Sequence, residues 1–425
     1  MRAHTAIVGG GIMGTALAMH LAERLHPIDE PVVLFERRRL GAGSSGRSAA
    51  ILRQHYAARD LAGMARDSLR VWAGFEAATG YAVGFQRTGV VVLARSEAAR
   101  ARLRANVAML REVGVRTELV EGDALRKRVH GVELGDGDLG AWEPDGGFVD
   151  PERAIAAFAS VARYRGATTR ADCPVTGLRV EGGRLVGLET GDGPVECARA
   201  VVCAGAWTRA LLEPHGVELP LEVVAPRQQL LAMPAPPPSA RLPDPVELAP
   251  PGVPLVDTAL RPVNDAAARP AAHAVVLDLE HGFAARCEPA LERTRIAALD
   301  LAAMPRLSDP DALDESTDPA FAAWARATAA RRLPAYRESE DMGQLAGWYT
   351  LTPDDRPLIG PLPEIEGLWI VAGFNGHGFK LAPSIGEGVA RMLCGEPAGT
   401  FEASAFASQR FTGPGRSVRE AAFGL

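Results

Sequence analysis

The chain has 425 residues, of which 47% are hydrophobic and 23% charged, and its formal net charge is −6. This composition is that of a folded protein, and the slightly acidic balance gives no sign of nucleic-acid binding. A chain of this length exceeds one ordinary hydrophobic core, so we expect two domains.

Five cysteines are scattered without a CxxC pair or a metal-ligand spacing, which predicts reduced thiols and no metal site. The uncharged stretch AIVGGGIMGTALAMHLA resembles a signal peptide, but its spaced glycines and the lack of a small-residue cleavage site argue against one. No uncharged run is long enough to span a bilayer. We therefore expect a cytoplasmic location.

The first predicted unit reads strand, glycine turn, helix and strand, in the order TAIV, GGGIMG, TALAMHLAERL and PVVLFE. In this context the GxGxxG pattern of Gly9, Gly11 and Gly14 predicts a dinucleotide-binding fold. Gly9 makes the tight turn, Gly11 lets the backbone approach a pyrophosphate, and Gly14 lets the helix pack on the sheet. The helix N-terminus at Ile12 and Met13 is a candidate phosphate site.

Glu36 ends the second strand, where its carboxylate would accept hydrogen bonds from ribose hydroxyls. The same charge would repel a 2′-phosphate and so disfavours NADP. Arg37, Arg38 and Arg39 follow and are interpreted as surface charge, although Arg37 is also kept among the candidate cofactor contacts.

The segment LGAGSSGRSAAILRQHY, residues 40–56, follows where a simple NAD-binding unit would continue into a helix. Its small residues let the backbone pass close to a flat ring system, and Ser44 and Ser45 can donate to a pyrophosphate. This segment therefore favours FAD.

The next elements alternate between helices and strands. We predict a helix over residues 57–80, a strand at TGVVVLAR and an arginine-rich helix reaching residue 130. Asp150 is predicted to cap a helix whose first residue is Pro151. A hairpin should turn at Gly182-Gly183, and ARAVVCAGAW should contain a short buried parallel strand.

The proline-rich stretch 233–254 predicts an extended loop or lid, the alternative being a solvated surface excursion without function. After it we expect a strand at HAVVLDL, a helix around FAAWARATAARRL and a strand before Gly347.

The turn GFNGHGFK opens a last helix and contains Lys380, one of only two lysines in the chain; the other is Lys127. A lysine in the first turn of a helix opposes the helix dipole. Either an exposed lysine tolerates this position, or a bound anion offsets its cost.

These motifs, together with VVCAGAW and TPDDRPLIGPLP, resemble the D-amino-acid-oxidase-type flavoenzymes, and within them the sarcosine oxidase and dimethylglycine dehydrogenase branch. The resemblance implies a glutathione-reductase-type FAD fold, with a Rossmann-like FAD-binding domain and an interleaved mixed-sheet α+β substrate domain. The FAD-binding domain would comprise residues 1–85, 140–220 and 340–425. The substrate domain would comprise residues 86–139 and 221–339, including the proline-rich stretch.

The resemblance also implies which residues contact FAD. Besides the glycine turn, Glu36 and Arg37, they are Ser44, Ser45, Arg47, Ser48, Ala50, Ile51, Val175, Ala204, Gly205, Trp207, Gly376, His377, Gly378, Phe379 and Lys380. Lys380 and Arg53 would hold a substrate carboxylate, and Tyr349 would line the same pocket. His377 is interpreted as a structural hydrogen bonder to the flavin, not a base.

Two departures from the family pattern matter. Some sarcosine oxidases tether the flavin through a cysteine where this chain has Gly347, so we predict non-covalent FAD. No lysine lies between Lys127 and Lys380 to activate oxygen, and Arg286 cannot be assumed to replace one. This weakens an oxidase relative to a dehydrogenase with another electron acceptor.

The resulting hypothesis is FAD-dependent oxidation of the C–N bond of a small amino acid or N-alkyl amino acid, giving an imine that is hydrolysed. The expected partners are a carboxylate-bearing amine and either O2 or a redox partner, in a homo- or hetero-oligomer. Two alternatives stay open: an FAD-dependent hydroxylase of related fold, and a flavin-bearing subunit of a larger dehydrogenase.

Overall fold

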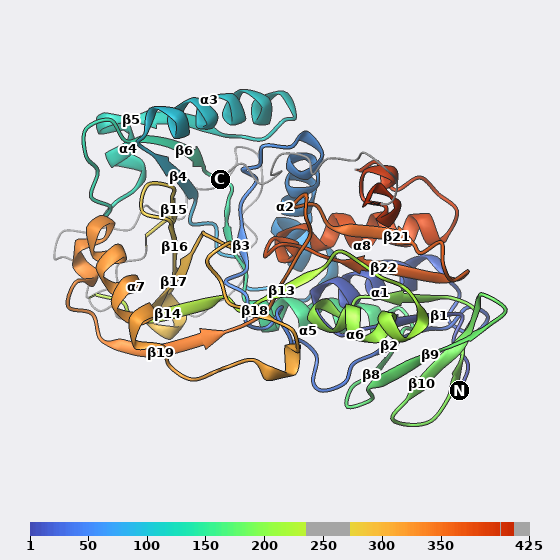
Figure 1. The fold of residues 1–425 in the computed structure, drawn as a ribbon. Coiled ribbons are helices and arrows are strands. Elements are labelled where there is room, and N and C mark those ends of the chain that lie inside the picture. Colours follow the sequence, from blue (N-terminus) through green and yellow to red (C-terminus); the bar gives the residue numbers. More distant parts are fainter. Residues whose placement is uncertain (235–272, 400, 412–425) are drawn as a thin grey trace.

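The computed structural model describes residues 1–234, 273–399 and 401–411. Figure 1 shows two regions side by side: β1, β2 and β22 with α1 and α8 form one, and β4 and β14–β17 with α3 and α7 form the other. Segments from both ends of the chain meet in the first region, so the chain crosses between the two regions more than once.

A six-stranded sheet forms the first region, in the order β21-β22-β12-β1-β2-β8. All of its strands run parallel except β21, which pairs antiparallel with β22. The strands are β1 (Thr5–Val8), β2 (Val32–Phe35), β8 (Thr168–Arg170), β12 (Ala200–Val202), β21 (Leu358–Pro361) and β22 (Leu368–Ala372).

Both faces of this sheet are covered, which explains why its central strands are continuous apolar runs. Ile7 of β1 packs on the helical side, while Ala6 and Val8 pack toward a three-stranded sheet on the other face. The helices are α1 (Ile12–Arg24), α2 (Arg59–Thr79), α5 (Pro151–Tyr164) and α8 (Gly378–Leu393). The covering sheet comprises β9 (Val175–Glu181), β10 (Arg184–Thr190) and β11 (Val195–Glu196).

The second region is an eight-stranded sheet in the order β19-β14-β17-β16-β15-β4-β6-β5, in which only β15 and β4 pair in parallel. Its strands are β4 (Val90–Ala94), β5 (Glu118–Glu121), β6 (Leu139–Glu143), β14 (Arg227–Ala232), β15 (Val275–Asp278), β16 (Phe283–Glu288), β17 (Arg293–Ala298) and β19 (Asp341–Ala346). One face packs on α7 (Pro319–Arg332) and α4 (Gly122–Arg128), and the other on α3 (Glu97–Glu112).

Two small sheets lie where the regions meet. One pairs β3 (Ile51–Leu52) with β7 (Gly147–Phe148). The other has the order β18-β13-β20 and comprises β13 (Glu222–Val224), β18 (Arg306–Leu307) and β20 (Tyr349–Leu351). A short helix, α6 (Thr208–Leu212), follows β12. Arg53 follows β3 and Tyr349 begins β20, so both residues lie where the two regions meet.

Most of the predicted elements are confirmed, including α2, the Asp150-capped α5, the hairpin through Gly182-Gly183 and the buried strand β12. The arginine-rich helix predicted to reach residue 130 is wrong in extent. It ends at Glu112, because Gly114 turns with φ +81°, and β5 and α4 follow. Most of the proline-rich stretch 233–254 lies outside the described residues.

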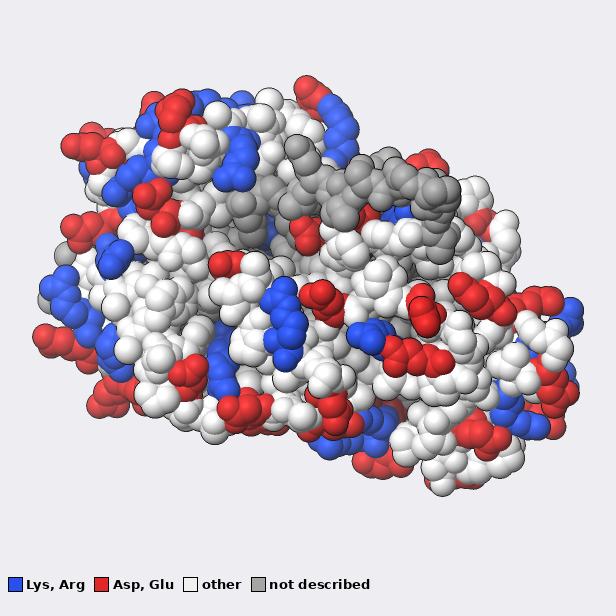
Figure 2. Space-filling view, in the orientation of Figure 1, with Lys and Arg blue, Asp and Glu red and all other residues white. Residues whose placement is uncertain are grey.

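The division into two discontinuous domains remains a prediction. β6 and β19 lie at the starts of the predicted FAD-binding segments 140–220 and 340–425. In the structure both strands belong to the eight-stranded sheet of the second region. Among the described residues, no helix is long and apolar enough to cross a bilayer. Figure 2 shows basic and acidic side chains interspersed over one face of the molecule, without a large area of a single sign.

Candidate active site

The glycine turn between β1 and α1 is packed too tightly for side chains. A Cβ on Gly14 would lie 2.0 Å from the carbonyl oxygen of Gly9, and a Cβ on Gly9 would lie 2.4 Å from that of Cys203. Gly9 also has φ +115°, a conformation that favours glycine. The side chains of Ile12 and Met13 are buried, so only their backbone groups could serve a ligand.

The carboxylate of Glu36 lies against this turn, and its predicted bonds to ribose hydroxyls stay a prediction. It accepts hydrogen bonds from the backbone N–H of Gly10 (2.8 Å) and of Arg38 (2.9 Å). The N–H of Cys173 bonds to the Glu36 carbonyl oxygen (2.9 Å), which brings the start of β9 and the half-buried Val175 beside Glu36. The structure therefore gathers the predicted adenosine contacts at one edge of the six-stranded sheet.

Arg37 and Trp207, both predicted to contact the cofactor, meet a residue that the sequence did not single out. The Arg37 guanidinium lies 4.0 Å from the Trp207 ring centroid and pairs with Asp311 (2.6 Å). The indole N–H of Trp207 also donates to Asp311 (3.0 Å). The structure thus places Arg37 in an exposed ion pair, and Trp207 covers the small-residue segment at Gly43. Ala204 lies beside Gly9, and Gly205 begins the short 3-10 helix that ends at Trp207.

Three hydrogen bonds hold the segment after β2, residues 40–51, in place. Ser45 Oγ accepts from the N–H of Ile12 (3.0 Å), and Ser48 Oγ accepts from that of Ala50 (2.9 Å). Arg286 Nη1 donates to the carbonyl oxygen of Ala49 (2.6 Å). Ser44 and Ile51 are half-buried in the same segment.

Ala50 itself is strained, with φ +46°, and it is buried. Such strain persists only where the surroundings enforce it, and it concentrates at functional sites. Here the N–H of Val149 binds the Ala50 carbonyl oxygen (3.2 Å), completing the bracing of this residue.

Arg47, which belongs to the segment predicted to lie beneath the pyrophosphate and flavin, bonds to residues of the second region. Its guanidinium donates to the carbonyl oxygen of Ala346 (2.9 Å), pairs with Glu315 (2.8 Å) and lies 4.7 Å from the Trp348 ring centroid. All three partners precede β20 in the chain. Arg47 therefore links the small-residue segment to the second region.

Arg53 and Lys380, the two predicted carboxylate anchors, line the same cavity of about 810 Å³, together with Tyr349 and His377. Arg53 follows β3 and is 3% exposed, while Lys380 lies in the first turn of α8 and is 8% exposed. The exposed-lysine alternative is therefore wrong. Burial lowers the pKa of Lys380 well below its usual value, and the positive charge of Arg53 lowers it further.

The guanidinium of Arg53 is oriented by its neighbours. Its Nη1 donates to the carbonyl oxygen of His55, its Nη2 lies 2.9 Å from His377 Nδ1, and its carbon lies 4.7 Å from the Tyr56 ring centroid. Burial, followed by the charges of Lys380 and Arg53, lowers the pKa of His377 well below its usual value. A neutral His377 accepts from Arg53 through Nδ1, and its predicted hydrogen bond to the flavin stays a prediction.

Glu143, at the end of β6, is a buried carboxyl that sequence reasoning missed. It is fully buried, and one oxygen accepts from the backbone N–H of Gln54 (2.7 Å), next to Arg53. Burial raises its pKa to about 7, against the lowering effects of that hydrogen bond and of the Arg53 and Lys380 charges. Its only sequence signal is an acidic residue closing the otherwise apolar strand LGAWE.

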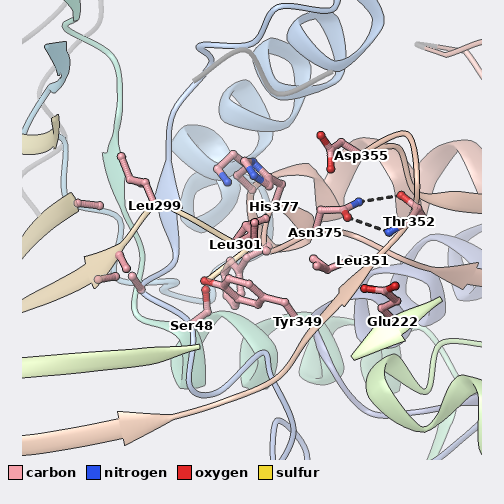
Figure 3. A pocket seen from close by; sticks show the side chains of 18 of the residues that line it. Ser48, Glu222, Leu299, Leu301, Tyr349, Leu351, Thr352, Asp355, Asn375 and His377 are labelled. Atoms are coloured by element: carbon pink, nitrogen blue, oxygen red, sulfur yellow. Dashed lines mark hydrogen bonds between the residues drawn. The ribbon is translucent and has the colours of Figure 1, made fainter. Parts of the chain in front are cut away.

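Figure 3 shows how Asn375, also missed, joins the glycine-rich turn to the end of β20. Its amide nitrogen donates to Thr352 Oγ1 (3.0 Å) and its amide oxygen accepts from the N–H of Thr352 (2.9 Å). The next residue, Gly376, has φ +77°, and a Cβ there would lie 2.7 Å from the Tyr349 ring. Glycine is thus required for Tyr349 to lie against this turn, beside His377.

The remaining turn residues are packed. Phe379 is buried with its ring 5.8 Å from that of Trp72, and a Cβ on Gly378 would lie 2.9 Å from the ring of Phe374. At Gly347, where a flavin-tethering cysteine would stand, the neighbouring side chain is Arg47.

The residues present fit a bound flavin dinucleotide. Neither α1 nor α8 has a side-chain N-cap or an acidic residue in its first turn, so both leave N–H groups and positive dipole ends for anions. Without side chains, the glycine turn at α1 lets a pyrophosphate approach the backbone, and the start of α8 lines the large cavity. Among the described residues, no group of three or more His, Cys, Asp or Glu side chains could hold a metal ion.

Comparisons with known proteins agree with this geometry. The chain is 27% identical over 420 residues to 4-methylaminobutanoate oxidase (formaldehyde-forming) of Paenarthrobacter nicotinovorans, covering 96% of this chain and 46% of the relative. It is 25% identical over 412 residues to mitochondrial dimethylglycine dehydrogenase of Mus musculus, covering 93% and 43%. The chain thus spans less than half the length of these two curated relatives.

A solved structure shares the fold. L-proline dehydrogenase from P. horikoshii superposes with a TM-score of 0.79 at 22% identity, covering 96% of this chain and 98% of that one. The family model described as DAO, FAD dependent oxidoreductase, matches residues 4–392. The chain therefore belongs to the DAO family of FAD-dependent oxidoreductases, and FAD is its cofactor.

Proposed function

We propose that this protein oxidises the C–N bond of an amino acid or N-alkyl amino acid. The observation that carries this proposal is the burial of Arg53 and Lys380 at one cavity, although they come from distant parts of the chain. Among the described residues neither cation forms an ion pair with a carboxylate, although the charge of Glu143 acts on both. Buried cations are costly unless a ligand supplies the negative charge. A substrate carboxylate would do so, with charge-assisted hydrogen bonds to both.

The bound FAD would accept two electrons from the carbon that carries the amine. Arg53 and Lys380 would fix the carboxylate, and Tyr349 would limit the orientations of the substrate, so that positioning supplies much of the rate. A neutral amine needs no dedicated base, and the neutral His377 is engaged with Arg53. The imine product would be hydrolysed in water.

The named activities of the two curated relatives support this chemistry. Both 4-methylaminobutanoate and dimethylglycine are N-methylated amines that carry a carboxylate. The electron acceptor is O2 or another redox partner. Arg286 is committed to Ala49 and to Glu288 (3.1 Å), which leaves it poorly placed to serve oxygen.

The test is anaerobic mixing of the yellow holoenzyme with matched pairs of amines, for example sarcosine and its methyl ester. The acid should bleach the visible flavin band and the ester should not, because only the acid can engage both cations. Equal bleaching by both compounds would contradict the carboxylate anchor. Readmitting air then separates an oxidase, which reoxidises quickly, from a dehydrogenase.

The same samples test the remaining predictions. NADH alone should leave the flavin band unchanged; bleaching by NADH would favour the hydroxylase alternative. Acid denaturation should release all of the FAD, because Gly347 offers no side chain for a covalent bond. Activity that appears only with a second protein would favour the alternative of a flavin-bearing subunit.

A further inference from the structure

One wall of the cavity is apolar, in contrast to the end that carries Arg53 and Lys380. Strands β15, β16 and β17 and residues 299–302 line the cavity with aliphatic side chains, among them Leu277, Ala284, Ala297, Leu299 and Leu301. In Figure 3, Leu299 lies on the side of these strands, whereas Asn375, Thr352 and Glu222 lie on the opposite side.

This wall stays apolar because its nearest charges are engaged elsewhere. Arg286 shares a face of β16 with Ala284, since side chains alternate along a strand. Its guanidinium turns toward the Ala49 carbonyl oxygen, the carboxylate of Glu288 and the Phe148 ring, whose centroid lies 4.0 Å away. The next cation on the same face of β17, Arg295, pairs with Glu288 (2.8 Å).

Part of the wall is accessible, whereas Leu277 and Ala284 are buried. Ala297, Leu299 and Leu301 are all half-buried, although each is apolar. At the other side of the cavity, Arg306 pairs with Glu222 (3.4 Å) and Arg209 pairs with Glu213 (2.7 Å). An apolar group in the cavity would therefore gain most by lying on this wall.

We infer that the substrate carries an apolar group beyond its carboxylate and amine, an aliphatic chain or a ring, which packs on the wall of Leu277, Ala284, Ala297, Leu299 and Leu301. The inference rests on the proposed function, because the carboxylate anchor at Arg53 and Lys380 decides which end of the substrate faces the wall. It makes these five residues determinants of specificity, and it disfavours glycine or sarcosine as the best substrate.

Unreactive straight-chain carboxylates test this on the FAD-loaded full-length protein. Acetate, butanoate and hexanoate share the anchor group and differ only in chain length. Titration calorimetry should show the Kd falling about fourfold for each added methylene, the value for moving a CH₂ group out of water. The heat-capacity change of binding should become more negative in the same order.

Variants locate the effect. Leu299→Ala should weaken hexanoate binding about tenfold and acetate binding less than about twofold, because only the longer chain reaches the wall. Leu291→Ala changes the same residue type at an exposed position and should alter neither. If Leu299→Ala fails to fold, Ala297→Leu is the substitute: it fills the space beside the wall and should likewise weaken hexanoate more than acetate.

The outcomes separate the two proposals. Binding of all three carboxylates with equal Kd would overturn the apolar-group inference and leave the proposed function standing. No binding by any of them would contradict the carboxylate anchor, and the inference would fall with it. A gradient that Leu299→Ala leaves unchanged would also overturn the assignment to this wall.

Discussion

The two sheets use charge in opposite ways. Around the six-stranded sheet the critical positions are glycines, and charged side chains such as Arg37 and Arg39 lie in exposed ion pairs. The eight-stranded sheet instead buries its charges: Arg332 is held between Asp138 and Asp278, and Arg295 pairs with Glu288. Glycines around the six-stranded sheet let the backbone approach a cofactor closely. Buried ion pairs on the eight-stranded sheet stabilise the strands that line the substrate cavity.

From this contrast we predict that adding a methyl group to the glycine turn weakens FAD binding through a steric clash. Gly14→Ala would place a methyl group 2.0 Å from a backbone oxygen that cannot move away cheaply, so FAD affinity should fall at least about a hundredfold. The control is Gly63→Ala in α2, where nothing lies within 4 Å. It should keep FAD and gain up to about 1 kcal/mol in free energy of unfolding. Equilibrium dialysis and urea unfolding measure the two effects; normal FAD binding by Gly14→Ala would contradict the account.

Removing the arginine from the buried cluster of Arg332, Asp138 and Asp278 should lower the stability of the protein, because buried negative charge is left without its cation. Arg332→Met leaves the buried Asp278 without an arginine and leaves the buried Asp138 with Arg95 alone, which should lower the free energy of unfolding by about 3–5 kcal/mol. The adjacent Arg331 is exposed, so Arg331→Met should change stability by less than about 0.5 kcal/mol. Similar losses in both variants would show that the cluster does not carry the stability of this sheet.

The buried carboxyl of Glu143 predicts that the stability of the protein depends on pH. Its folded pKa of about 7 exceeds its ordinary value of 4.5, so the folded state binds the proton more tightly and stability is lost as pH rises between these values. Glu143→Gln should remove that loss and be more stable than the unsubstituted protein by about 3 kcal/mol at pH 8. At pH 4 the two should be nearly equal. A stability difference that does not vary with pH would contradict this assignment.

The smallest expected effect concerns Asp311, which contacts both Arg37 and Trp207, two of the predicted cofactor contacts. Asp311→Asn weakens an exposed ion pair, worth up to about 1 kcal/mol, so FAD should dissociate at most about fivefold faster. Asp309→Asn, two residues away, is the control. A change of a hundredfold would mean that Asp311 contributes far more than a surface pair.

The sequence was enough to predict the family and the FAD cofactor, because the motifs that indicate them are local. A glycine turn, a strand-ending Glu36 and a lysine at a helix start each identify themselves within a few residues. Asp311, Asn375 and Glu143 could not be found this way. Each acts through a partner far away in the chain, as Glu143 does through Gln54, and no spacing rule describes such contacts. The helix ending at Glu112 was overextended because arginines favour helix equally on both sides of Gly114.

The account depends most on Lys380 being a buried carboxylate anchor, and the chain supplies its own control in Lys127, its only other lysine, which is exposed. The decisive measurement is the Kd of acetate for the FAD-loaded Lys380→Met and Lys127→Met proteins, by calorimetry between pH 6 and pH 9. Lys380→Met should weaken binding about a hundredfold at pH 6. The unsubstituted protein should lose affinity as pH rises through the lowered pKa of Lys380, because the ammonium deprotonates. Equal acetate affinity in both variants would contradict the proposed function.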